Sequence, residues 1–477
     1  MTRPRNATPR TASTRRRRTA ATAATAAILA AVVAVPSGAY ASGGFVAGSS
    51  GTGDPFFPLA GNGGYDVSHY SLNLNYQPSS KRLTGTTTIS ATATENLYRF
   101  DLDLRGFDIS RLTVDGRAAS WRHEGQELII TPHNKLHRGQ HFTVTVGYAG
   151  VPQAVTDPDG STEGWVATDD GAVVADEPQG APSWYPVNDN PADKATFDFS
   201  VSVPSGLTAM ANGVLTGEHT SHGTSTFTWR ENLPMAPYLA TATVGKFDLT
   251  TSKVDGRLPS YVAVDPSLTA SRAVLDKIPS IINYFSSIYG PYPFDAVGAI
   301  VDNAPDLGYS LETQTKPVFA GMPGESTLAH ELAHQWYGDT VTVKTWPDIW
   351  LHEGFATWSE WIWSEHEGGT TAAQQFASLY SRPATSSLWA FPVANPGEAP
   401  NLFGTPVYDR GAMVLEALRE KIGDTAFFRI MRDWIVQHRY GNATTADFTK
   451  LAERDSHQNL KNFFNVWLYQ AGKPTSW

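Results

Sequence analysis

The amino-acid sequence predicts an α+β fold, in which an N-terminal antiparallel β-sheet domain is followed by a mostly helical domain. Between residues 65 and 250, short runs alternate apolar and polar residues and are separated by Gly, Pro, Asp and Asn turns. From about residue 270 the apolar residues recur with the period of a helix, and helical stretches dominate after Ser326. We therefore predict a β domain over residues 65–253 and a helical domain over 254–477.

The first 41 residues have the pattern of a secretory signal peptide. Seven arginines precede an apolar run from Ala20 to Val35, and the small-residue site Ala39-Tyr40-Ala41 follows it. A membrane anchor is the alternative, but the run is short and weakly apolar for crossing a bilayer. We therefore expect residues 1–41 to be removed and the mature protein to be secreted into the extracellular space. Export by the general secretory route and by the twin-arginine route both stay open.

Two sets of strands are expected to follow a short leader. Residues 42–64 are rich in Gly and Ser, which indicates a flexible leader. The first set of alternating runs lies within residues 69–150 and the second within residues 196–250. Many short strands at this spacing are typical of antiparallel sheets and not of βαβ units.

Composition and charge limit the function classes. The chain has 477 residues, 41% of them hydrophobic, and no cysteine, which excludes disulfides, Cys-ligated zinc and thiol catalysis. Loss of a signal with seven arginines and no acid would lower the net charge from −10 to −17. Such an acidic protein repels nucleic acid and anionic membranes, so we expect neither as a partner. No other apolar run is long enough to cross a membrane, and we expect a soluble monomer.

The stretch LAHELAHQWYGD, residues 328–339, predicts a helix in the second domain. Ser326 or Thr327 can cap it, and the helical pattern continues to about Tyr337. An apolar stripe at every fourth residue would pack on the core, and it consists of Leu328, Leu332 and Trp336.

His330 and His334 fall on nearly the opposite face of this helix, one turn apart. Two imidazoles at that spacing can bind one zinc ion, and Glu331 can reach a water on the metal. The alternative is a chance match made by two core histidines. The motif therefore indicates metal-dependent hydrolysis but needs support from elsewhere in the chain.

A catalytic zinc site needs a third protein ligand beside an open position for water. Residues 348–363, DIWLHEGFATWSEWIW, predict a second helix with Glu353 near its start, and eighteen residues separate Glu353 from His334. Glu353 would complete a His, His, Glu set. Three other polar side chains on this helix are weaker candidates: Glu360, Glu365 and His352.

Glu360 lies seven residues after Glu353 and on the same face, so it could support the site from outside. A solvated acid, or an acid at the edge of the core, is the simpler interpretation. His352 is expected to point elsewhere and not to bind the metal.

HELAHQW, the eighteen-residue gap and LHEGFATW resemble the aminopeptidase N family of zinc metallopeptidases, gluzincins whose relatives include leukotriene hydrolases. The resemblance extends from about Tyr65 to Trp477 and implies a thermolysin-like catalytic domain over residues 254–477. Glu331 would be the general base. One Zn²⁺ per chain would be held by three ligands, His330, His334 and Glu353. The family usually has Asn where His352 stands, and this leaves the ligand set intact.

An aminopeptidase also needs carboxylates that hold the free α-ammonium group of its substrate. By the same resemblance, Glu312 matches the amine-binding Glu of the family motif Gly-x-Met-Glu-Asn. Tyr309 and Leu311 replace the Gly and Met of that motif. The pocket for the first residue of the substrate would therefore be reshaped, and it would be formed by Tyr309, Ser310 and Leu311. The alternative for Glu312 is an ordinary surface acid.

Two further residues take roles through the resemblance. Glu177, within residues 174–197, matches a second amine-binding acid, although a plain loop acid before Pro178 is the alternative. Tyr408, in the pattern Tyr-x-x-Gly-Ala at the start of a helix, matches the tyrosine that hydrogen-bonds the oxyanion.

The resemblance implies a zinc-dependent aminopeptidase that acts on peptides with a free N-terminus. The alternatives are a secreted zinc endopeptidase, an epoxide hydrolase like the leukotriene branch, and a non-catalytic binding protein of the same fold. Many family members continue with domains that cap the cleft, whereas this sequence ends where the catalytic domain would end. We therefore expect a short two-domain form with a more open cleft.

Overall fold

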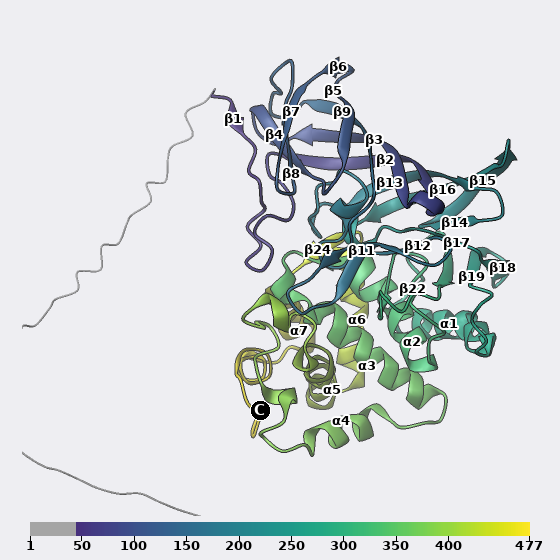
Figure 1. The fold of residues 1–477 in the computed structure, drawn as a ribbon. Helices are drawn as coiled ribbons and strands as arrows, with labels where there is room; N and C mark the ends of the chain where they lie inside the picture. The colour runs from purple at the N-terminus through teal and green to yellow at the C-terminus, as the bar shows by residue number, and fades with distance from the viewer. Residues whose placement is uncertain (1–43) are drawn as a thin grey trace, which may run out of the picture. The chain divides into compact units, whose positions relative to one another are not determined.

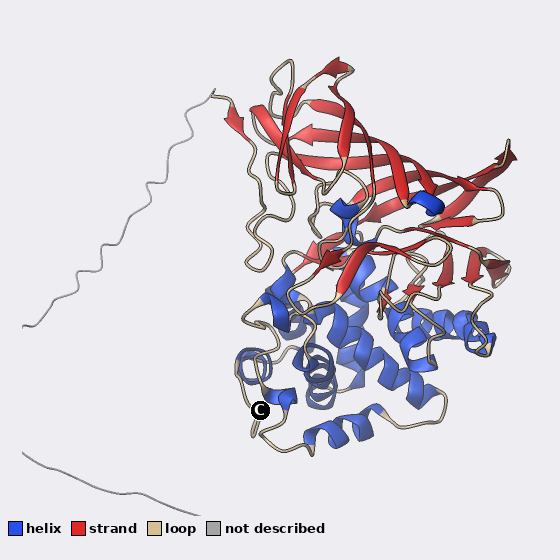
Figure 2. Cartoon of the chain, in the orientation of Figure 1, coloured by secondary structure: helices blue, strands red, loops and turns tan. Residues whose placement is uncertain are grey.

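The computed structural model describes residues 44–477, so the predicted signal peptide lies outside the described residues (Figure 1). Strands dominate the N-terminal half and helices the C-terminal half, which confirms the predicted α+β fold (Figure 2). Among the described residues, no helix is both long enough and apolar enough to cross a membrane.

The largest sheet has eight strands in the order β15-β16-β13-β2-β3-β9-β5-β6. Neighbouring strands are antiparallel except β2 and β13, which run parallel. Alternate residues of β2 and β13 are buried, as the sequence pattern requires. The strands are β2 (Tyr65–Gln77), β3 (Arg82–Ala93), β5 (Asp108–Val114), β6 (Arg117–Ala118), β9 (His141–Gly150), β13 (Ala195–Pro204), β15 (Val214–Ser221) and β16 (Thr224–Met235).

Two smaller sheets complete the N-terminal half. One has the order β1-β4-β8-β7, with β1 (Val46–Ala47), β4 (Leu97–Asp103), β7 (Ser120–Glu124) and β8 (Glu127–Thr131). The other has the order β10-β11-β12-β17-β14, with β10 (Val155–Thr156), β11 (Thr162–Ala167), β12 (Ala172–Ala175), β14 (Thr208–Ala211) and β17 (Ala242–Gly245). Glu177 lies two residues after the end of β12, so the second sheet positions it.

Several of residues 44–64 pack against the rest of the chain, which corrects the flexible leader that their composition indicated. The side chain of Phe57 is 4% exposed, and its ring lies 6.3 Å from that of Trp346. Asp54 Oδ2 accepts a hydrogen bond of 2.8 Å from the backbone N–H of Trp346. A buried aromatic ring and a fixed carboxylate thus hold the segment against the turn that precedes the Glu353 helix.

The C-terminal half begins with a mixed sheet that the sequence analysis did not predict. Its order is β18-β19-β20-β22-β21, with β18 (Asp248–Val254), β19 (Leu258–Val264), β20 (Val297–Val301), β21 (Ser310–Leu311) and β22 (Val318–Phe319). Strands β19 and β20 are parallel, and α1 (Ile278–Tyr289) connects them as a βαβ crossover. Residue 253, the predicted boundary, falls inside β18, and the boundary itself stays a prediction.

Helices form the rest of the C-terminal half, together with a short parallel pair, β23 (Val341–Val343) and β24 (Gly441–Ala443). Fully buried tryptophans fill the core between them, among them Trp336, Trp350 and Trp358. The helices are α2 (Glu325–Ala333), α3 (Trp350–His366), α4 (Ala372–Tyr380), α5 (Gly411–Ile422), α6 (Asp424–His438), α7 (Thr445–Ser456) and α8 (Lys461–Phe464).

Helix α2 confirms the predicted element but corrects its two ends. It begins at Glu325, so the cap position is Gly324, which has no side chain to cap the helix; Ser326 lies inside the first turn, and its hydroxyl donates to Glu360. The regular helix ends at Ala333, and a wider turn follows, in which Gly338 has a φ of 144°. A φ in this range favours glycine, so the chain can turn sharply four residues after the second histidine.

Candidate active site

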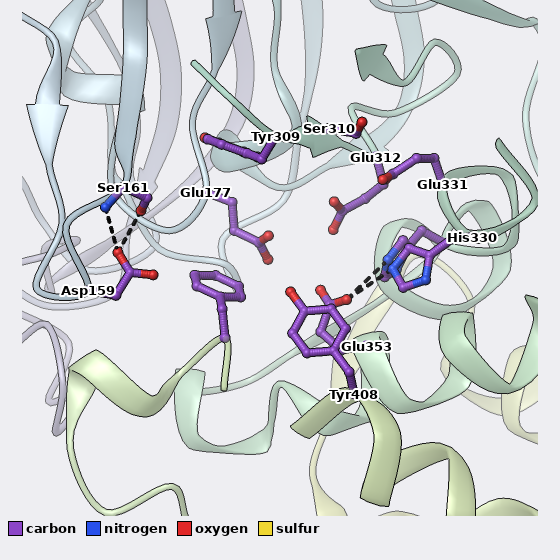
Figure 3. A pocket seen from close by; sticks show the side chains of 12 residues that line it. Asp159, Ser161, Glu177, Tyr309, Ser310, Glu312, His330, Glu331, Glu353 and Tyr408 are labelled. Atoms are coloured by element: carbon purple, nitrogen blue, oxygen red, sulfur yellow. Dashed lines mark hydrogen bonds and ion pairs between the residues drawn. The ribbon is translucent and has the colours of Figure 1, made fainter. Parts of the chain in front are cut away.

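One cavity brings together residues from both halves of the chain (Figure 3). Of the residues predicted to act as ligands, base, oxyanion donor, amine-binding acids or first-residue pocket, Leu311 alone does not line it, because it is 1% exposed and packs in the core. The lining comprises Asp159, Ser161, Glu177, Tyr309, Ser310, Glu312, His330, Glu331, His334, Glu353, Phe403 and Tyr408.

The contact between α2 and α3 places the three predicted metal ligands together. His330 lies on α2, His334 directly follows it, and Glu353 is in the first turn of α3. Glu353 Oε2 lies 3.1 Å from His330 Nε2 and 3.6 Å from His334 Nε2. The three residues are 9% exposed or less, so few water molecules can hydrogen-bond with their side chains.

The outer nitrogens of both imidazoles are already engaged. His330 Nδ1 lies 2.7 Å from Glu360 Oε1, and His334 Nδ1 lies 3.0 Å from the backbone carbonyl of Tyr337. If each Nδ1 carries the proton and donates it, each Nε2 presents a lone pair toward Glu353. Gly338 is required here, since a Cβ would lie 2.9 Å from His334 Nδ1.

This arrangement fits a zinc ion. Three acceptor atoms, two imidazole nitrogens and one carboxylate oxygen, converge with no donor between them. Ligands of a tetrahedral zinc at about 2.0–2.2 Å from the metal lie roughly 3.3–3.6 Å apart, close to the separations observed. The three residues also form a cluster whose ligand atoms all lie within 4.8 Å of one another. His330, His334 and Glu353 can therefore hold the metal.

Glu360 is the residue that the sequence analysis undervalued. Its interpretation as an ordinary acid is wrong, because its two oxygens contact His330 and Ser326. The i+7 spacing from Glu353 was the available signal, but spacing alone does not show that a neighbouring helix carries a matching histidine.

Loss of the Glu360 carboxylate should weaken metal binding. We expect Glu360→Ala to lower the zinc affinity about 10- to 100-fold, because nothing then orients the His330 ring. Competition with a chelator measures this directly. Glu360→Gln, which keeps an acceptor oxygen, is the matched control and should retain most of the affinity. Equal affinities for the two variants would contradict the orienting role.

Charge interactions within the site shift the pKa values of its members strongly. Burial alone would lower the pKa of His330, but hydrogen bonds to Glu353 and Glu360 raise it well above its usual value. For the carboxyl group of Glu353 burial acts in the opposite direction and would raise the pKa, yet the two imidazoles hold this pKa far below its usual range. The cluster therefore stabilises a positive charge beside Glu353, which is the charge that a metal cation supplies.

Glu331 stands beside this cluster without belonging to it. Its side chain is 5% exposed and lines the cavity (Figure 3). Burial raises the pKa of Glu331 to about 8, against the opposing effect of the two histidines. A carboxyl group whose pKa lies near neutrality can both accept and release a proton.

Glu177 and Glu312 face each other across the cavity from different halves of the chain (Figure 3). They are 7% and 2% exposed, and in the described part of the chain Oε1 of each has no hydrogen-bond partner. Burial, followed by repulsion from Glu312, raises the pKa of Glu177 well above its usual value. Two unpartnered buried carboxyl groups make a site that a bound cation would complete.

His352 does not point away from the site as the sequence analysis expected. It is fully buried, and one ring nitrogen lies within 4.8 Å of carboxyl oxygens of Glu177 and Glu312. It does not line the cavity, so it lies behind the two acids.

Close packing of α3 and α5 places Tyr408 over the metal ligands. Gly354 and Gly411 meet at the helix contact, where a Cβ on Gly411 would lie 2.8 Å from the Cα of Gly354. Tyr408 precedes α5 by three residues, and its ring centre lies 6.1 Å from that of His330. Only the absence of a side chain at both glycines allows α3 and α5 to pack this closely.

Three lining residues, Asp159, Ser161 and Phe403, were missed by the sequence analysis. Asp159 and Ser161 lie in the turn between β10 and β11, and Phe403 lies five residues before Tyr408. No local pattern marks them, because turn residues reach a site only through the tertiary fold.

Two family models match the chain. The Peptidase M1 N-terminal domain matches residues 66–239, and the Peptidase family M1 domain matches residues 321–467. Aminopeptidase M1-D of Oryza sativa subsp. japonica is 30% identical over 330 residues, which cover 64% of this chain and 37% of that protein. Glutamyl aminopeptidase of Sus scrofa is 25% identical over 458 residues, which cover 85% of this chain and 47% of that protein. The chain thus spans less than half the length of these relatives.

A solved structure covers almost the whole described chain. The M1 zinc metallopeptidase from Deinococcus radiodurans aligns with a TM-score of 0.82 and 29% identity, covering 89% of this chain and 99% of that one. Both family models, the relatives and this structure point to the same family of peptidases. The chain belongs to peptidase family M1.

Proposed function

We propose that this protein is a secreted zinc-dependent aminopeptidase that hydrolyses the first peptide bond of peptides. One observation carries the proposal: the unpartnered carboxyl groups of Glu177 and Glu312 share a cavity with the metal-ligand cluster and Glu331. An endopeptidase has no need for two buried acids beside its metal, whereas an α-ammonium group needs such partners.

The residues of the cavity have separate roles in hydrolysis. Zinc held by His330, His334 and Glu353 would supply Lewis-acid chemistry for the scissile carbonyl and for water. Glu331 accepts a proton from the attacking water and passes it to the leaving amine. Tyr408 donates a hydrogen bond to the carbonyl oxygen as negative charge develops there.

Glu177 and Glu312 set where the chain is cut. By binding the ammonium group they hold the first peptide bond near Glu331. The bond is then already in position for attack, which removes the entropy cost of orienting the substrate during the reaction. His352 lies close to both acids, and neither of its ring nitrogens hydrogen-bonds with another described residue.

The solved relatives support peptides as the substrate class. A variant of the Deinococcus radiodurans protein was crystallised bound to a Tyr-Ser-Ala substrate. The N-terminal signal pattern, which precedes the described residues, supports the proposal that the enzyme works outside the cell, on peptides with a free N-terminus.

A substrate with a blocked N-terminus tests the exopeptidase assignment. We expect acetylation of a short peptide to lower its kcat/KM by at least about 100-fold, because it removes the charge that the two acids bind. The matched pair is the same peptide with and without the acetyl group, with products identified by mass. Equal cleavage of the two peptides, or cleavage inside the chain, would favour the endopeptidase alternative.

A further inference from the structure

The cavity extends beyond the two amine-binding acids. Asp159 and Ser161 lie at the end of the cavity opposite His330 (Figure 3). Glu177 lies between this pair and His330, and Tyr309 lies along the upper wall. If Glu177 and Glu312 hold the amine and the metal ligands face the carbonyl, the first side chain must occupy this remaining end. The following inference rests on that proposed function.

Asp159 is the one carboxylate in the cavity that the reaction does not use. The lining includes five acidic side chains and neither lysine nor arginine, and the other four acids have roles in the metal, base and amine sites. Among the described residues, no basic side chain pairs with Asp159. An exposed, unpaired carboxylate at the end of an acidic cavity attracts a cation.

The orientation of Asp159 is fixed. Its Oδ1 accepts hydrogen bonds from the backbone N–H of Ser161 at 2.9 Å and from the Ser161 hydroxyl at 2.6 Å. Its Oδ2 takes part in neither bond and is free for a ligand. A carboxylate held in this way loses little side-chain entropy when it binds a partner.

Tyr309 offers a second polar group at the same end. Its hydroxyl oxygen is buried, and within residues 44–477 it has no hydrogen-bond partner. Burial, together with the nearby acids Glu163, Glu177 and Asp176, raises the pKa of Tyr309 well above its usual value. The hydroxyl therefore stays neutral, and its surroundings are negative. The aromatic rings of Tyr309 and Phe403 provide the apolar walls.

We propose that Asp159 and Tyr309 select a cationic first residue, with arginine preferred over lysine. A guanidinium group carries five N–H donors in one plane, so it can donate to Asp159 Oδ2 and to the Tyr309 hydroxyl together. Its alkyl stem and flat face suit a pocket walled by two aromatic rings. Tyr309, one of the residues at which this sequence departs from the family motif, thus acquires a function in substrate choice.

A panel of aminoacyl reporter substrates tests this selection. We expect kcat/KM of the unmodified enzyme to fall in the order Arg, Lys, Leu, Glu. Asp159→Asn should lower the Arg-to-Leu ratio of kcat/KM about tenfold, the size expected for a hydrogen bond between charged groups in a partly exposed site. Asp159→Lys should move the preference toward Glu. Asp169→Asn removes an exposed acid from the neighbouring turn, outside the cavity, and should leave the ratio within about twofold.

The outcomes separate the two proposals. If the unmodified enzyme prefers Leu to Arg, or if Asp159→Asn leaves the ratio unchanged, the cationic preference is wrong and the aminopeptidase assignment stands. If zinc-loaded enzyme hydrolyses none of the substrates, the proposed function fails and this inference fails with it. Thermal unfolding of each variant verifies that the turn substitutions leave the fold intact.

Discussion

Glu331→Gln will lower kcat by about a thousandfold or more and leave one zinc ion bound per chain. Glutamine keeps the shape of the side chain but can neither accept nor release a proton, and this role is worth roughly 10²–10⁴ in rate. Glu331 contributes no atom to the His330, His334 and Glu353 cluster, so metal binding does not depend on it. Steady-state kinetics on an aminoacyl reporter and metal analysis of the same sample measure both quantities.

A ligand variant is the matched control for this experiment. Glu353→Gln should lose zinc and activity together, since the carboxylate is the only anionic member of the cluster. Near-normal turnover by Glu331→Gln would exclude it as the general base. Loss of zinc from that variant would instead give Glu331 a structural role in the site.

The metal-ligand cluster could be predicted from sequence because short-range geometry determines most of it. Two histidines four residues apart share one face of any helix, so His330 and His334 had to lie together. The position of Glu353 needed only one further assumption, that the second helix packs against the first. Glycines at the α3 and α5 contact allow the close packing that places Tyr408 nearby.

The parts that sequence reasoning missed depend on contacts between distant segments. The leader looked flexible because it is rich in Gly and Ser, yet Asp54 and Phe57 fix it to Trp346, almost three hundred residues away. Glu360 looked like a solvated acid until the fold placed His330 beside it. Composition describes what a segment prefers alone, and tertiary contacts override that preference.

The same reasoning applies to the specificity of the cavity. Tyr309 could be singled out because it departs from a family motif, but its direction and partners could not be inferred. Asp159 carried no signal, since an acid in an Asp-Pro-Asp-Gly turn is an ordinary surface residue. The fold brings both to one end of the cavity and gives them a shared ligand chemistry.

Tyr408→Phe will lower kcat about 100-fold with little change in KM. Burial, together with the surrounding acids, raises the pKa of the Tyr408 hydroxyl well above its usual value, so it remains protonated and can donate a hydrogen bond. A single donor to a developing oxyanion is worth roughly 10²–10³ in kcat. Phenylalanine keeps the ring that stacks near His330, so zinc content and thermal stability should not change.

The partition between kcat and KM decides what Tyr408 does. A donor that acts only on the developing charge lowers kcat and kcat/KM equally, whereas a donor that merely holds the substrate raises KM. Tyr469→Phe, at an exposed tyrosine outside the cavity, is the control and should alter neither constant. A raised KM with unchanged kcat in Tyr408→Phe would assign the hydroxyl to substrate binding. Hydrolysis would then depend on Glu331 and the metal alone, and the packing of α5 against α3 would serve affinity and not rate.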